Sequence, residues 1–218
     1  MKHVRIVGLA VVAAAALMAL VGASTASATV LCKTIPAGSP TGTTCPAGWA
    51  LQAGDKIHAT LTTGTDGTLT TNETFKPNIT CKKTTIEVEI TAEGSATATA
   101  RGNVTALTIE ECGENEVKTL TKGSVEIHWI EGTHNGTLTG TGTEITTVTP
   151  SIFGNIHCIY TTNATDLGTL TGGTTASMRA ESVPIPKLAT SSLCPTAPTW
   201  DATYTITTPD TLTVAAHT

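Results

Sequence analysis

The chain has 218 residues and a formal net charge of −5, with 12 Lys and Arg against 17 Asp and Glu. Charged residues make up 13% of the chain, about half the ~25% of an ordinary soluble domain, and the sequence pI of about 5.6 excludes the basic surface that nucleic-acid binding requires. Threonine accounts for 49 positions. Because β-branched residues favour strands, the composition indicates an all-β protein with no nucleic-acid partner.

The first 28 residues have the features of a cleavable signal peptide. Lys2 and Arg5 provide a positive start, residues 6–21 are almost wholly apolar, and residues 26–28, Ala-Ser-Ala, have the small-x-small pattern of a cleavage site. The apolar run of about 16 residues is shorter than the ~20 residues that a membrane-spanning helix needs. We therefore expect residues 1–28 to be removed and the remaining chain to be secreted, with no membrane span.

One domain is expected after cleavage. Residues 29–55 are rich in Pro and Gly and carry two cysteines, which predicts an irregular entry segment pinned by a disulfide. Residues 56–218 predict the β domain to which that segment belongs. Leu, Ile, Val and Phe make up only about 19% of residues 29–218, near the composition at which a chain fails to fold, so the expected core is lean.

Six cysteines follow the predicted signal peptide, and an even number in an exported chain predicts disulfides. They are Cys32, Cys45, Cys81, Cys112, Cys158 and Cys194. A zinc site would need closely spaced pairs such as C-x-x-C, and the sequence has none. Several connectivities are open, and we favour the sequential pairing Cys32–Cys45, Cys81–Cys112 and Cys158–Cys194 because it closes local loops.

Apolar and polar residues alternate in many short runs. In residues 85–91, Ile86, Val88 and Ile90 share one face while Glu87 and Glu89 share the other. Similar runs are Ile57/Ala59/Leu61, Thr105/Leu107/Ile109, Val125/Ile127/Trp129, Ile156/Cys158/Tyr160, Ala176/Met178/Ala180 and Ala202/Tyr204/Ile206. One apolar and one polar face are typical of antiparallel strands with a solvated side.

Turn residues separate these runs. Asp66-Gly67, Asn135-Gly136 and Gly172-Gly173 accept the positive φ angles of tight turns and predict hairpins. Residues 183–198 contain four prolines and predict a long connection before the last strands. The fold class that follows is all-β: an antiparallel β-sandwich or barrel-like single domain of about 8–11 short strands, held by disulfides.

Several of these features occur together in a known group of proteins. They are the signal peptide, Cys45-Pro46 before a glycine-containing strand entry, residues 105–108 (Thr-Ala-Leu-Thr) leading to Cys112, residues 193–195 (Leu-Cys-Pro), and Trp200 with residues 202–204 (Ala-Thr-Tyr). The chain resembles the exported, threonine- and glycine-rich, six-cysteine β proteins of soil actinobacteria. The resemblance implies export and a disulfide-bonded β fold; that group has no established activity, so it implies no substrate or catalytic residue.

Patterns typical of catalysis or metal binding are scarce. His128 and His134 lack the H-E-x-x-H order that places two imidazoles on one helical face, so we interpret them as a solvated strand histidine and a turn histidine. The sequence contains no G-x-S-x-G nucleophile motif. A glycosidase needs two carboxyl groups, and the acidic pairs in this sequence are Glu87/Glu89, Glu110/Glu111 and Glu114/Glu116. Acidic strand faces are a commoner origin of such pairs, and we predict no metal and no cofactor.

Three functions remain open. The first is a secreted, non-enzymatic protein with a binding or structural role at or outside the cell envelope. The second is an extracellular carrier of a small apolar ligand, because barrel mouths can hold such molecules; its candidate lining residues are Trp49, Trp129, Tyr160, Trp200 and Tyr204. The third is a secreted hydrolase that uses surface carboxylates. A cavity lined by those aromatic residues would favour the carrier.

Overall fold

The computed structural model describes residues 29–35, 45–46, 48–73, 78–95, 97–152, 154–188 and 192–216. In these ranges the chain forms thirteen strands and no helix, so the predicted all-β class is confirmed and the strands outnumber the expected 8–11. None of the described residues belongs to a helix that could cross a membrane. The predicted signal peptide lies outside the described residues.

The strands differ widely in length, and the longest belong to the barrel wall. They are β1 (Thr29–Cys32), β2 (Lys56–Leu61), β3 (Gly67–Thr70), β4 (Ile79–Cys81), β5 (Lys83–Ala92), β6 (Ala100–Glu110), β7 (Glu116–Trp129), β8 (Gly136–Thr149), β9 (Ile156–Thr161), β10 (Thr165–Thr171), β11 (Ser177–Pro184), β12 (Thr199–Thr208) and β13 (Thr213–Ala216). At 14 residues each, β7 and β8 exceed the short strands that the sequence predicts.

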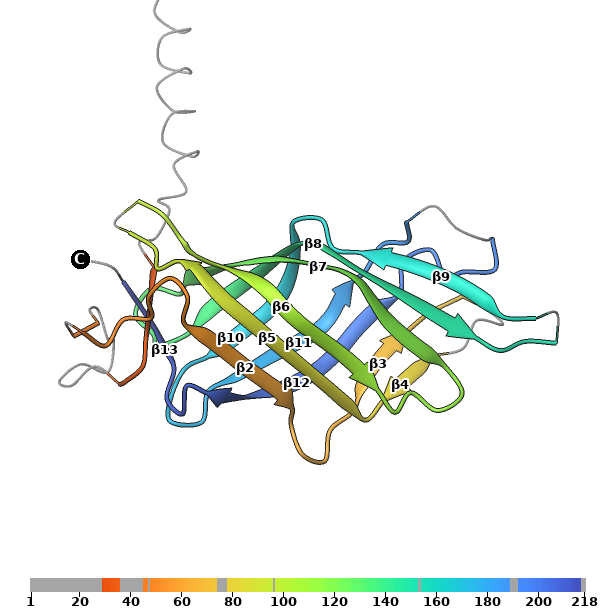
Figure 1. Ribbon diagram of the computed structural model, residues 1–218, viewed down its shortest axis with the longest axis horizontal. Coiled ribbons are helices and arrows are strands. Elements are labelled where there is room, and N and C mark those ends of the chain that lie inside the picture. Colours follow the sequence, from red (N-terminus) through yellow and green to blue (C-terminus); the bar gives the residue numbers. More distant parts are fainter. Residues whose placement is uncertain are drawn as a thin grey trace, which may run out of the picture.

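Eight strands close into an antiparallel barrel (Figure 1). Their order is β11-β10-β8-β7-β6-β5-β2-β12, and β12 pairs back onto β11 from Ser177↔Thr205 to Pro184↔Thr199. Closure gives each of these strands a paired neighbour on both sides over at least part of its length. Of the two architectures expected from the sequence, the barrel is the one observed.

The strands β2 and β3 follow each other along the same edge of β12. Leu61 pairs with Tyr204 and Leu69 pairs with Trp200, both antiparallel, so β2 and β3 run in the same direction. The prediction of a hairpin at Asp66-Gly67 is therefore wrong: Asp66 lies in the connection between two strands that run in the same direction, and Gly67 begins β3. The other two predicted turns do connect hairpins, β7 to β8 and β10 to β11.

The disulfides follow the sequential pairing. Cys81–Cys112 and Cys158–Cys194 belong to a second, smaller core at one end of the barrel, together with Tyr160. The strands β3, β4 and β9 extend the barrel wall around this core. Three disulfides indicate an oxidising, extracellular environment.

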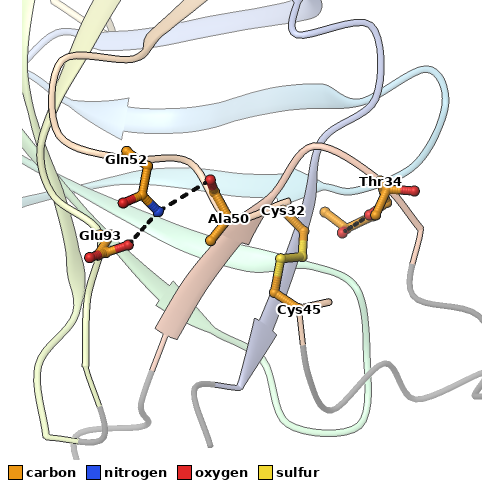
Figure 2. The surroundings of a disulfide bond; sticks show 7 residues. Cys32, Thr34, Cys45, Ala50, Gln52 and Glu93 are labelled. Atoms are coloured by element: carbon orange, nitrogen blue, oxygen red, sulfur yellow. Dashed lines mark hydrogen bonds between the residues drawn. A yellow bond between two sulfur atoms is a disulfide. The ribbon is translucent and has the colours of Figure 1, made fainter. Parts of the chain in front are cut away.

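The opposite end of the barrel is covered by a separate ribbon in which β1 pairs with β13. Leu31, Leu212 and Val214 at this end of the barrel are at most 1% exposed and belong to the main core. The Cys32–Cys45 disulfide ties the ribbon to the segment that leads into β2 (Figure 2). Residues 29–55 are thus pinned by a disulfide as predicted, but they are not wholly irregular, because β1 is a regular strand.

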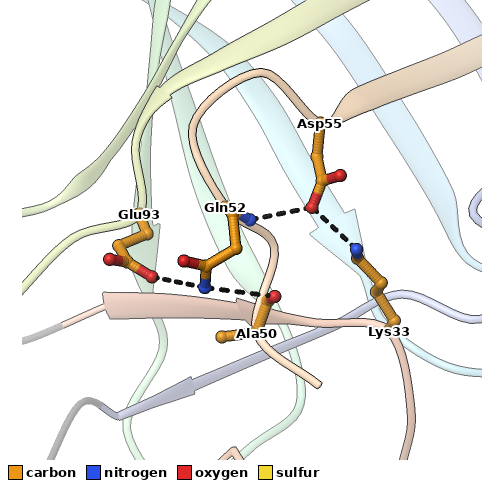
Figure 3. A network of polar contacts seen from close by, with 5 residues as sticks. All are labelled: Lys33, Ala50, Gln52, Asp55 and Glu93. Atoms are coloured by element: carbon orange, nitrogen blue, oxygen red, sulfur yellow. Dashed lines mark hydrogen bonds and ion pairs between the residues drawn. The ribbon is translucent and has the colours of Figure 1, made fainter. Parts of the chain in front are cut away.

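A small polar network fixes the last part of this entry segment (Figure 3). The Asp55 carboxylate accepts a hydrogen bond from the backbone N–H of Gln52 at 2.8 Å and forms an ion pair with Lys33 at 2.7 Å. The Gln52 amide nitrogen donates to the Glu93 carboxylate at 2.7 Å. The Lys33 contact, followed by the Gln52 N–H, lowers the pKa of Asp55. The network joins the covering ribbon to the end of β5.

One predicted inward position is wrong. The alternation Thr105/Leu107/Ile109 places Thr105 in the core, but the pairing of β5 with β6 shifts between Glu87↔Ala106 and Val88↔Val104. This β-bulge inserts an extra residue and turns Thr105 outward. Its hydroxyl donates to the Glu87 carboxylate at 2.7 Å instead.

Candidate ligand-binding cavity

A cavity of about 160 Å³ lies within the barrel. It is lined by inward side chains of the barrel strands, such as Val88 of β5 and Val125 of β7. The lining reaches Leu212, beside the covering ribbon, and Ile109 and Ile185 at the end that carries the second core. The cavity therefore runs along much of the barrel.

The wall of the cavity is almost entirely carbon. Most lining residues are Ile, Leu, Val or Ala, and its polar residues are Thr143, Thr162, Tyr160, Trp200 and Tyr204. None of the lining residues carries a formal charge near neutral pH. Such a surface favours apolar molecules by burial and offers no counter-charge to an ion.

Three of the five predicted lining residues reach the cavity: Tyr160, Trp200 and Tyr204. Trp49 does not line it and is 52% exposed. Trp129 packs against the main core instead, and its indole N–H donates to the backbone oxygen of Thr133 at 2.7 Å. The sequence indicated inward aromatic residues but not which of them border free space.

Trp200 and Tyr204 form a polar pair on β12. They are four residues apart, so they share one face of the strand, and the Trp200 indole N–H donates to the Tyr204 hydroxyl at 3.1 Å. Tyr204 is 2% exposed, and burial raises its pKa to about 12. Burial likewise raises the pKa of Tyr160 to about 12. Both phenols are therefore neutral near pH 7.

Side chains in the middle of the barrel are less completely packed than those beside the ribbon. Ile86, Leu107 and Met178 point inward and line the cavity, yet they are only half-buried, whereas Leu31 and Val214 are fully buried. Large aliphatic residues alone do not fill this region. Alternation in the sequence identifies such inward residues, but not whether their combined volume fills the barrel.

The backbone pairing of β6 with β7 covers only part of the two strands. Their backbone pairing runs from Ala100↔Ile127 to Asn103↔Ser124 and stops there. Farther along, the Thr119 hydroxyl donates to the backbone oxygen of Leu107, a cavity residue, at 2.7 Å. We call the stretch between Thr105–Glu110 and Glu116–Lys122 the β6–β7 seam.

Of the acidic pairs considered for hydrolysis, Glu87/Glu89 lies on a face of β5, whereas Glu111 and Glu114 lie in the connection between β6 and β7. Glu87 contacts Lys56 at 2.9 Å and accepts from Thr105, and these two hydrogen bonds lower its pKa. His128 and Glu126 lie 3.8 Å apart, and both are about 40% exposed. These groups lie on the solvent side of the strands, away from the cavity.

No group of three or more His, Cys, Asp or Glu residues suited to hold a metal ion occurs among the described residues. His134 sits in the β7–β8 connection and supplies a backbone oxygen to Val214, which is a structural role. His217 lies outside the described residues.

Comparison with protein-family models, with curated proteins and with solved structures finds no match. The barrel cavity and its lining are therefore the features on which a function can be assigned.

Proposed function

We propose that this protein is a secreted, non-enzymatic binding protein that holds one small apolar molecule inside its barrel. The observation that carries the proposal is the carbon-lined cavity of about 160 Å³. Eight-stranded barrels have an interior just wide enough to be filled by side chains or to hold one small ligand. In this barrel the side chains leave space.

The size of the cavity limits the ligand. An apolar cavity of about 150 Å³ stays dry and binds benzene, whereas pockets for drug-sized molecules measure roughly 300–1,000 Å³. We therefore infer a ligand of on the order of ten non-hydrogen atoms. Larger rings such as sterols and porphyrins do not fit this volume.

The shape of the cavity favours a chain over a ring. On β8 the lining residues extend from Leu138 to Ile145, seven steps of roughly 3.3 Å, or about 23 Å along the strand. A small volume distributed over such a length is narrow. A linear aliphatic molecule matches it better than a compact aromatic one.

A binding experiment with a filled cavity tests the proposal. Ala59 lines the cavity and is 5% exposed, so Ala59→Leu places three more carbon atoms in the lumen. Heptane binding to the purified mature protein should be measured by the rise in its unfolding temperature, because a ligand that binds only the folded state stabilises it. We expect stabilisation of the wild-type protein and little or none of Ala59→Leu.

The matched control is Ala106→Leu. Ala106 pairs with Glu87 on the outer face of β6, so this variant adds the same atoms outside the cavity and should bind heptane like the wild type. Failure of the wild-type protein to bind heptane, or equal binding by both variants, contradicts a ligand site in the barrel. The protein would then be assigned a structural or surface-binding role at the cell envelope.

A further inference from the structure

We propose that the ligand is an uncharged chain molecule carrying one oxygen atom that accepts a hydrogen bond, and that Tyr204 and Thr84 supply the donor. This inference rests on the proposed function and names the class of molecule that the cavity takes. It follows from a small group of buried polar atoms at the wall of an otherwise apolar space.

The group consists of Trp200, Tyr204 and Thr84. Trp200 and Tyr204 line the cavity, and the indole N–H donates to the phenolic oxygen. Thr84 of β5 is 1% exposed. Its hydroxyl interacts with the Tyr204 hydroxyl and has no other hydrogen-bond partner in the described part of the chain. The Tyr204 hydroxyl and Thr84 therefore meet where three barrel strands, β5, β2 and β12, lie in succession.

Counting hydrogen atoms shows that the group has a donor to spare. It holds three donor hydrogens, one on the indole and one on each hydroxyl. The indole hydrogen is used on Tyr204, and one hydroxyl can donate to the other. The remaining hydroxyl hydrogen then has no acceptor within the group, although buried polar groups in native proteins are generally paired. An oxygen atom of a bound ligand would accept it.

Charge restricts the ligand further. No Lys, Arg or His lines the cavity in the described part of the chain, so a carboxylate would be buried without a counter-charge, which is strongly unfavourable. An ammonium group is excluded by the matching absence of Asp and Glu from this lining. Alcohols, ketones, aldehydes and esters remain.

The experiment compares heptane, heptan-1-ol and sodium heptanoate at neutral pH. Their dissociation constants are measured by calorimetry on the mature protein and on Tyr204→Phe, Thr84→Val and Tyr160→Phe. Tyr160→Phe is the matched control, because Tyr160 also lines the cavity but its hydroxyl already hydrogen-bonds Thr147. The isosteric Thr84→Val keeps the test valid if Tyr204→Phe, which removes the partner of Trp200, fails to fold.

We expect the affinity ratio of heptan-1-ol to heptane to fall by roughly three- to ten-fold in Tyr204→Phe and Thr84→Val, the value of one net hydrogen bond. In Tyr160→Phe the ratio should stay within two-fold of the wild type, and heptanoate should not compete for the site. An unchanged ratio in both Tyr204→Phe and Thr84→Val, or heptanoate binding as tight as that of heptan-1-ol, overturns this inference alone. If the wild-type protein binds neither heptane nor heptan-1-ol, the proposed function fails with it.

Discussion

The backbone N–H of Trp129 donates a hydrogen bond to the hydroxyl of Thr29 at 2.9 Å, across 100 residues of sequence. Thr29 is the first residue of β1 and Trp129 is the last residue of β7. The contact therefore joins the ribbon that covers one end of the barrel to the barrel wall. The Cys32–Cys45 bridge (Figure 2) fixes the same ribbon to the segment that leads into β2.

Replacing Thr29 by valine should weaken the contact between the ribbon and the barrel wall. The substitution keeps the shape of a fully buried side chain but leaves the Trp129 N–H without its acceptor, which costs about 1–3 kcal/mol. We expect the free energy of unfolding, measured with urea, to fall by that amount. Thr169→Val, at an exposed position of β10, is the control and should change it by less than about 0.5 kcal/mol. Equal effects of the two changes would show that the Thr29 hydroxyl contributes nothing.

Alkaline pH should unfold the protein as its tyrosines ionise. The chain has two tyrosines, and burial raises the pKa of both Tyr160 and Tyr204 from 10.0 to about 12. Below pH 10 the folded and the unfolded chain both keep their phenolic protons, so the stability of the folded protein is fully present. As the pH rises from about 10 to 12, the unfolded chain releases protons that the folded protein retains, so stability falls. Tyrosinate absorbance should therefore rise late and together with the loss of β circular dichroism. Gradual ionisation centred on pH 10 in a folded protein would contradict the burial of both residues.

The disulfides should differ in how much they stabilise the fold. Cys158–Cys194 spans 36 residues and Cys32–Cys45 spans 13. Cross-linking a longer loop restricts the unfolded chain more. Replacing both cysteines of Cys158–Cys194 by alanine should therefore lower the free energy of unfolding by about 4 kcal/mol, and the same change at Cys32–Cys45 should lower it by about 3 kcal/mol. Urea unfolding of both variants under non-reducing conditions gives the comparison. If the Cys32–Cys45 variant lost more free energy of unfolding, the contribution of this bridge would come from holding the β1–β13 ribbon in place rather than from restricting the unfolded chain.

The β6–β7 seam should exchange its amide hydrogens early. Outside Ala100–Asn103 and its partners on β7, β6 and β7 no longer pair with each other. The amides of both strands that face the seam are therefore poorly protected, whereas those that face β5 and β8 stay paired. We expect peptides from Thr105–Glu110 and Glu116–Lys122 to take up deuterium in native conditions before those of β2, which pairs with a strand on each side. Protection of the seam equal to that of β2 would contradict this prediction.

The local parts of the structure could be predicted from the sequence. Alternation correctly identifies the inward residues of β5, where Val88 and Ile90 are buried, because a strand has a fixed period of two. The sequential disulfides and two of the three hairpin turns follow from short-range signals. Barrel closure does not, because the pairing of β11 with β12 and of β12 with β2 depends on the register of residues far apart in the chain.

The cavity was predictable only in outline. Tyr160, Trp200 and Tyr204 are inward in both sequence and structure, yet the space beside them depends on barrel width and strand tilt. The bulge that turns Thr105 outward also has no local signal, because it arises where β5 and β6 change register. Thr84 was not singled out at all: one buried threonine among 49 has nothing in the sequence to distinguish it.

Because inward and outward positions alternate along every barrel strand, separate sets of residues form the cavity wall and the outer surface. Exchanging a few inward aliphatic side chains, such as Ile86 or Leu107, would resize the cavity and leave the outer surface as it is. Substitutions confined to inward positions can thus change which molecules the interior admits while the outer surface stays the same.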